Sequence, residues 1–158
     1  MIYVIDTGIF RKLLDHFPRQ GKLFEAIWEK FDKGIEAGDF ISVDECYNEL
    51  TRHFDEKTPN YIWLHERRYM FHNPTNEESI HIRTLFQKAK MRESIHTKNI
   101  LENRPAADAY LAAKAKALGA VVVTTETYKP TSAQLPNICE VLGVKCISYD
   151  DFMEMLSE

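Results

Sequence analysis

The stretch Met1-Ile-Tyr-Val-Ile-Asp6-Thr-Gly-Ile-Phe10 decides the fold, because five mostly apolar, β-favouring residues run directly into an acid. This pattern predicts a parallel strand over residues 1–5, buried on both faces, with Asp6 at its carboxyl end. Ligands of open α/β sheets bind in the crevice outside the carboxyl ends of the strands, so Asp6 stands where chemistry takes place. Capping of the next helix is the alternative role for Asp6. The functional interpretation therefore depends on whether other acids reach the same edge.

Length and composition indicate a single domain, residues 1–158. With 158 residues and 44% hydrophobic content, the chain can bury a substantial core. It shows no signal peptide, and no apolar run approaches the roughly 20 residues of a membrane helix, so we expect a soluble cytoplasmic protein with no membrane partner. The three cysteines form no CxxC pair and are expected to be reduced. The six histidines form neither an HxH nor an HExxH motif, so a zinc site is not supported.

The overall charge is acidic, but one segment is basic. A net charge of −4 argues against a protein that coats nucleic acid without specificity, although it does not exclude a nuclease. Residues 83–104 carry six basic side chains against two acidic ones. The predicted RNA-binding residues of this segment are Lys88, Lys90, Arg92, Lys98 and Arg104. A solvated helix face is the alternative interpretation of the same run.

Strand patterns alternate with helix patterns along the chain. Strands are predicted over residues 1–5, 40–43, 120–124 and 145–149. Helices are predicted over residues 8–16, 24–35, 44–57, 105–118 and 136–142, with Asp44 and Asp150 as expected caps of the third helix and of a last, terminal one. Residues 59–104 are expected to form a largely helical insert, with a capping box at Thr75–Glu78. This order predicts an α/β fold with a mostly parallel central sheet covered on both faces.

Three further acids are expected beside Asp6. Glu126 follows the strand at residues 120–124, and Asp108 opens the helix that leads into that strand, where pairing with the helix dipole is its alternative role. Glu49 lies about 100° from the centre of the buried line of its helix, whereas Glu45 lies about 140° away and is expected to point further into water. We therefore predict that Asp6, Glu49, Asp108 and Glu126 meet at one edge of the sheet.

Carboxylates gathered in this way predict a metal site. Like charges at close range raise one another's pKa, and a divalent cation removes that cost. Oxygen ligands suit Mg²⁺ or Mn²⁺, which also bind the phosphates of a substrate. A metal site of this kind can activate water and stabilise the leaving oxygen of an in-line displacement, so the implied reaction is phosphodiester hydrolysis.

The acidic motifs resemble those of PIN-domain ribonucleases. The matching positions are Asp6-Thr7 after the first strand, Glu49-Leu50 after the second, Asp108 with its alanine-rich helix, and Val-Val-Val-Thr-Thr-Glu126. Pro136-Asn-Ile-Cys139 is similar to a segment of prokaryotic PIN-like proteins of about this length, which include relatives of the VapC toxins. The resemblance covers nearly the whole chain.

The resemblance implies a three-layer α/β/α fold and an Mg²⁺- or Mn²⁺-dependent endoribonuclease with RNA as substrate. It also implies a toxin role held in check by an antitoxin protein, and it leaves a homodimer open. The implied catalytic and metal-binding residues are Asp6, Glu49, Asp108 and Glu126, supported by the hydroxyls of Thr7, Thr124 and Thr125.

Two positions depart from the PIN pattern and keep other functions open. Gly8 stands where PIN domains usually have Ser or Asn, so Thr7 would have to supply the missing hydrogen bond, and Glu126 stands where Asp is frequent. A weakened or inactive PIN-like protein that binds RNA or a partner is therefore one alternative. A haloacid-dehalogenase-like phosphatase is another, with Asp6 as nucleophile, Thr124 or Thr125 and Lys129 on the phosphate, and Asp150-Asp151 on the metal. That chemistry needs a second Asp two residues after the first, and Gly8 cannot serve.

Overall fold

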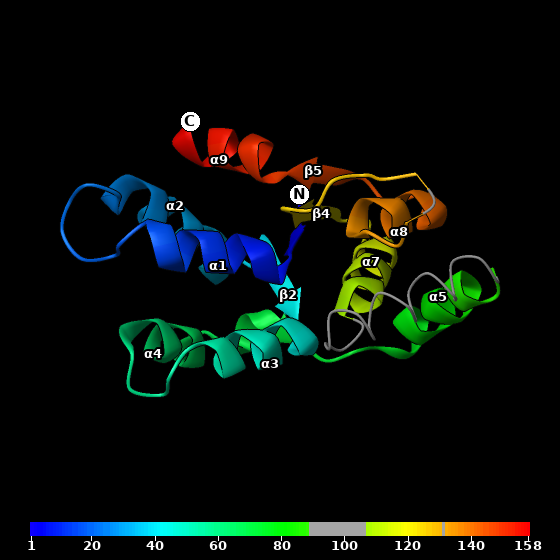
Figure 1. Ribbon diagram of the computed structural model, residues 1–158, viewed down its shortest axis with the longest axis horizontal. Helices are drawn as coiled ribbons and strands as arrows, with labels where there is room; N and C mark the ends of the chain where they lie inside the picture. The colour runs from blue at the N-terminus through cyan, green and yellow to red at the C-terminus, as the bar shows by residue number, and fades with distance from the viewer. Residues whose placement is uncertain (89–106, 131) are drawn as a thin grey trace.

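A parallel sheet forms the centre of the computed structural model, which describes residues 1–88, 107–130 and 132–158 (Figure 1). Its strands are β1 (Tyr3–Ile5), β2 (Phe40–Val43), β3 (Phe71–His72), β4 (Val121–Thr124) and β5 (Cys146–Ser148). Their order in the sheet is β3-β2-β1-β4-β5, and every neighbouring pair is parallel. The central strands β1, β2 and β4 are covered on both faces, which explains their continuous apolar sequences.

Helices cover both faces of this sheet. They are α1 (Thr7–His16), α2 (Glu25–Glu36), α3 (Asp44–His53), α4 (Pro59–Glu66), η1 (Arg68–Met70), α5 (Asn76–Phe86), α7 (Ala107–Leu118), α8 (Leu135–Leu142) and α9 (Tyr149–Ser157). In Figure 1, α1, α2 and α9 lie on one side of the sheet, and α5, α7 and α8 lie on the other. The predicted three-layer α/β/α architecture is confirmed.

Aromatic side chains bind the first helical layer to the sheet. Phe31, on the predicted apolar stripe of α2, is fully buried and contacts the rings of Phe10 and Phe152 edge-on. Phe40 of β2 packs against Phe31 of α2 and Phe152 of α9. This shared cluster fixes α1, α2 and α9 over one face of the sheet. Only Asp6 separates the end of β1 from the start of α1.

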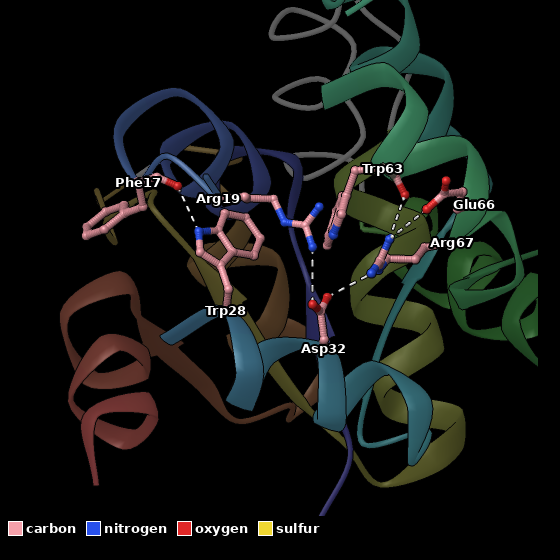
Figure 2. Close-up of polar contacts among 7 residues, drawn as sticks. All are labelled: Phe17, Arg19, Trp28, Asp32, Trp63, Glu66 and Arg67. Carbon is pink, nitrogen blue, oxygen red and sulfur yellow. Dashed lines mark hydrogen bonds and ion pairs between the residues drawn. The ribbon is translucent and has the colours of Figure 1, made fainter. Parts of the chain in front are cut away.

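A second cluster, at the other end of α1, joins α2 to α4 (Figure 2). The guanidinium group of Arg19 lies 5.0 Å from the ring centroid of Trp28 and 5.1 Å from that of Trp63. Asp32 accepts hydrogen bonds from Arg19 at 3.3 Å and from Arg67 at 3.2 Å, and the guanidinium of Arg67 also covers Trp63. These two arginines are therefore occupied in holding the helices together.

The structure corrects several boundaries. β3 lies within the segment predicted to be a helical insert, so the sheet has one strand more than expected. The third helix ends at His53 rather than near residue 57, and α1 begins at Thr7. Neither expected acidic cap acts as one: Asp44 is inside α3 and pairs with Arg68, and Ser148 caps α9 in place of Asp150.

The capping box predicted at the start of α5 is present: the Thr75 hydroxyl accepts from the Glu78 amide at 3.3 Å, and the Glu78 carboxylate accepts from the Thr75 amide at 3.1 Å. The cysteines form no disulfide in the described part of the chain. None of the described helices is both long enough and apolar enough to cross a membrane.

Candidate active site

The strand order places a crevice between β1 and β4. The chain winds outward from β1 to β2 and β3 in one direction and from β4 to β5 in the other, so the order reverses between these two strands. Ligands of doubly wound sheets bind at such a point, outside the carboxyl ends of the strands. Asp6 directly follows β1, and its amide donates to the Val123 carbonyl at 3.0 Å. Glu126 follows β4 by two residues, so both acids reach the predicted edge.

Asp6 is buried and held by two hydrogen bonds. Its Oδ1 accepts from the Thr7 amide at 2.7 Å, and its Oδ2 accepts from the Thr124 hydroxyl at 2.8 Å. The first bond also makes Asp6 the N-cap of α1, so the capping role and the position in the crevice are both real. Only 6% of the residue is exposed. This carboxyl group therefore cannot turn away from the crevice without losing both bonds.

Neighbouring acids shift the pKa of Asp6. Burial raises this pKa most, the charges of Asp108 and Glu126 raise it further, and the hydrogen bonds from Thr124 and Thr7 oppose them, so that the pKa rises from 3.8 to about 7. The structure thus brings three of the four predicted acids into one electrostatic group. Among the residues that the structure describes, no cation is one of the groups that shift this pKa.

Asp108 reaches the crevice from the opposite helical layer. It lies in the first turn of α7, which packs against β1, β2 and β4. The residue is 9% exposed, in agreement with its predicted place on the buried side of the helix. A carboxylate in a first helical turn is also favoured by the helix dipole. Burial near Asp6 is a position that the dipole alone does not require.

Glu126 has a structural role as well. Its Oε2 accepts a hydrogen bond of 2.6 Å from the amide of Leu135, the first residue of α8. Its own amide donates to the Thr124 hydroxyl at 3.1 Å, and that hydroxyl donates to Asp6. Thr124 therefore connects the ends of β1 and β4, as expected for a supporting hydroxyl. Part of the Glu126 carboxylate is used to cap α8.

Glu49 lies near Cys46, which in turn lies near Asp6 in the crevice. It is half-buried in α3, and its Oε1 is buried without a hydrogen-bond partner among the described residues. Burial raises the pKa of the Cys46 thiol, and the charges of Asp6 and Glu49 add to that rise, so Cys46 lies near both acids. Glu49 itself does not contribute to the shift of Asp6. The predicted fourth acid is therefore beside the group of three.

The expectation for Glu45 is wrong. This residue is half-buried, with Oε2 buried and unpartnered among the described residues, so it does not point into water. Burial raises its pKa, and the charges of Asp44, Glu78 and Glu49 contribute. The angular argument failed because it used only the buried line of α3 itself. It could not include α5, which brings the Glu78 carboxylate to this side.

Gly8 and the threonines around it depart from the expected pattern. A Cβ on Gly8 would collide with the Thr125 hydroxyl, so Thr125 fills the space that a side chain at position 8 would take. The Thr7 amide, rather than its hydroxyl, binds Asp6; the Thr7 hydroxyl lies by the buried Cys46 thiol. The role expected of the Thr7 hydroxyl is therefore performed by its backbone.

The chain matches one protein family over nearly its whole length. Its residues 3–158 match the model of a family described as a domain of unknown function, DUF4411. The chain belongs to the DUF4411 family. A comparison with curated protein sequences finds no match.

Solved structures share the fold of this DUF4411 protein. VapBC-1 from nontypeable Haemophilus influenzae matches with a TM-score of 0.54 and 15% identity, over 95% of this chain and 99% of that one. FitAcB from Neisseria gonorrhoeae gives a TM-score of 0.55 and 18% identity, over 94% and 98% of the two chains. PAE2754 from Pyrobaculum aerophilum gives 0.52 and 14%, over 99% and 97%. The resemblance to PIN domains is thereby confirmed at the level of the fold.

The acids of this DUF4411 chain fit a divalent cation by their chemistry, although their side chains are not gathered tightly. Asp6, Asp108 and Glu126 offer only oxygen donors, the kind that Mg²⁺ and Mn²⁺ prefer. A cation would also relieve the repulsion that raises the pKa of Asp6. Within residues 1–88, 107–130 and 132–158, no three acids, histidines or cysteines are close enough to hold an ion as they stand. Binding would require these side chains to move closer together. Oε1 of Glu49 makes no hydrogen bond among the described residues, so its movement would break none.

The structure describes one of the five predicted RNA-binding residues and two further exposed cations close to the crevice. Lys88 is exposed after α5, whereas Lys90, Arg92, Lys98 and Arg104 lie outside the described residues. Sequence reasoning passed over Arg11 and Lys12, two exposed cations on α1, because two adjacent bases are an ordinary feature of a solvated helix. Their helical spacing from Gly8 was the available signal, since residues three and four apart share a face.

Proposed function

We propose that this protein is a metal-dependent endoribonuclease that hydrolyses RNA phosphodiester bonds with Mg²⁺ or Mn²⁺. The observation that carries the proposal is the group formed by Asp6, Asp108 and Glu126 at the point where the strand order reverses. Acids from three separate elements, two of them nearly buried, are costly to assemble unless a cation uses them. The fold shared with VapBC-1 and FitAcB supports the same assignment.

Asp6, Asp108 and Glu49 would hold the metal, with Glu126 as a further ligand. When bound, the metal would lower the pKa of the attacking water and stabilise the leaving oxygen. The Thr7 amide and the Thr124 hydroxyl keep the Asp6 carboxylate in one orientation. Because the Asp6 pKa is about 7, a proton competes with the metal for this group below neutral pH.

We also propose a toxin role, with an antitoxin protein as partner. It rests on the PIN-domain resemblance of the acidic motifs and on the fold shared with VapBC-1 and FitAcB. Co-expression with the protein encoded next to this one, followed by purification of the pair and a cleavage assay, tests it. Inhibition of cleavage by the purified neighbour is the expected result.

A second candidate function is RNA or partner binding without cleavage. It is favoured by the hydrogen bond that commits one oxygen of Glu126 to α8, and by the loose spacing of the acids in the described part of the chain. In that case the acids would have only a structural role: Asp6 would cap α1, and Glu126 would bind the first amide of α8.

Cleavage of a mixed RNA pool separates the two functions. Wild-type protein should cut RNA with Mn²⁺ or Mg²⁺ and lose this activity in chelator. Asp6→Asn and Asp108→Asn should each lower the rate by orders of magnitude, because the ion loses a ligand. Asp39→Asn, which alters an exposed acid before β2, is the matched control and should retain activity. Equal rates for Asp6→Asn and wild type would refute the nuclease proposal.

A further inference from the structure

A groove along α1 opens beside the candidate active site. It has a volume of about 250 Å³ and is lined by Gly8, Arg11, Lys12, Asp15, His16 and Thr125, and we call it the α1 groove. At its inner end, Gly8 is two residues from Asp6, and Thr125 directly precedes Glu126. From residue 8 to residue 16 the groove follows α1 for about 12 Å. It therefore leads from the acids toward the surface.

The charge of the groove is opposite to that of the site it reaches. Arg11 and Lys12 are exposed along it, and its acid, Asp15, faces the ring of His53, with 3.8 Å between Oδ2 and Nε2. The whole chain has a net charge of −4. A basic groove that adjoins a group of buried acids on an acidic protein can guide an anion toward the metal.

Arg11 and Lys12 can bind a ligand, unlike the two arginines that pack on Trp28 and Trp63. Arg19 and Arg67 are bound to Asp32 and stacked on indole rings (Figure 2). Arg11 makes no hydrogen bond, ion pair or ring contact in the part of the chain that the structure describes. Lys12 has its Nζ 4.3 Å from the ring centroid of Tyr149, which orients the lysine side chain, and its ammonium pairs with no carboxylate of the described residues.

Gly8 and Thr125 lie close together at the inner end of the groove. A side chain at position 8 would collide with the Thr125 hydroxyl, and both residues line the groove. This hydroxyl can donate to a phosphate oxygen that enters the crevice. The groove thus offers a hydroxyl nearest the acids and two cations further out.

We propose that the α1 groove docks the phosphate backbone of single-stranded RNA next to the bond that is cut, an inference that rests on the proposed nuclease function. Arg11 and Lys12 are its phosphate contacts. An acidic peptide could also bind these cations, but it would meet the acids at the inner end. The negative charge of a phosphodiester would be attracted both by Arg11 and Lys12 and by a metal bound to the acids. RNA is therefore the occupant that suits both the outer and the inner end of the groove.

Binding of RNA to the non-cleaving Asp6→Asn protein tests this proposal. The probe is a labelled single-stranded RNA of mixed sequence, titrated at several salt concentrations. Removing two phosphate contacts in Arg11→Gln/Lys12→Gln should lower the affinity roughly 10- to 30-fold at about 0.1 M salt and reduce the slope of log affinity against log salt by about 1.4. Arg11→Gln alone, which keeps the Lys12 contact with Tyr149, should reduce the slope by about 0.7.

A charge-matched control removes two cations elsewhere. Lys33 and Lys145 are exposed, and they precede the amino ends of β2 and β5, at the edge opposite to the acids. Lys33→Gln/Lys145→Gln in the same Asp6→Asn protein should bind RNA nearly as tightly as its parent. With Asp6 restored, the groove variant should raise KM much more than it lowers kcat, because its cations hold the substrate away from the reacting phosphate.

The outcomes separate the two proposals. If wild type cuts RNA and the groove variant matches the control in affinity and salt slope, the groove proposal is overturned while the nuclease stands. Tighter binding of an acidic peptide than of RNA, lost in the groove variant, would overturn it in favour of a protein partner. Absence of both cleavage by wild type and binding by Asp6→Asn would overturn both proposals.

Discussion

Replacing Asp6 by asparagine should stabilise the metal-free protein at alkaline pH and lose this advantage on acidification. The folded state holds the proton of Asp6 with a pKa of about 7, against 3.8 when the group is free. Each pKa unit corresponds to about 1.36 kcal/mol, so the ionised carboxylate costs the folded wild type about 4 kcal/mol at about pH 8. At about pH 4.5 this cost falls to about 1 kcal/mol, because the folded carboxyl is protonated and the unfolded one only partly ionised.

The asparagine side chain carries no such titration. It retains one acceptor for the Thr7 amide but disturbs the bond with the Thr124 hydroxyl, a loss of about 1–2 kcal/mol that is independent of pH. The variant should therefore be more stable than wild type by about 2 kcal/mol at about pH 8 and less stable by up to about 1 kcal/mol at about pH 4.5, a change of about 3 kcal/mol between the two pH values.

Urea unfolding in chelator at the two pH values measures this change. Asp39→Asn is the control, since that acid is exposed and its replacement should give a small difference that varies little with pH. If the stability difference between Asp6→Asn and wild type is the same at both pH values, burial and neighbouring charges do not raise the pKa of Asp6. The electrostatic argument for the site would then be wrong.

Three further predictions concern the same edge of the sheet. Mn²⁺ should raise the melting temperature of wild type by mass action and that of Asp108→Asn by less, as followed by thermal unfolding; an unchanged wild-type value at millimolar Mn²⁺ would favour binding without cleavage. Gly8→Ser should destabilise the fold by about 1–3 kcal/mol through collision with Thr125, and Thr125→Ala in the same chain should recover most of the loss in a double-mutant cycle. Glu49→Gln should abolish RNA cleavage while Glu45→Gln changes it only a few-fold; the reverse result would show that α3 presents Glu45 to the metal.

Local patterns were sufficient for the elements with strong signals. Apolar runs marked β1 and β4, because a strand buried on both faces is apolar throughout. The apolar stripe through Phe31 marked α2, because a helix buried on one face repeats its apolar residues every three or four positions. β3 could not be found in this way. It has two residues, Phe71 and His72, and its place in the sheet comes from pairing with Ser42 and Val43 of β2.

By itself, the sequence determined that acids follow the strands at residues 1–5 and 120–124 and that parallel strands bring those acids to one edge. Only the tertiary structure decided what the acids meet there. The bond between Thr124 and Asp6 joins residues 118 positions apart, and the cap that Glu126 provides for α8 depends on where that helix packs. Periodicity records which face of an element is buried, but it does not record which neighbour covers that face. Burial and neighbouring charge set the pKa of Asp6, and both are properties of the assembled layers.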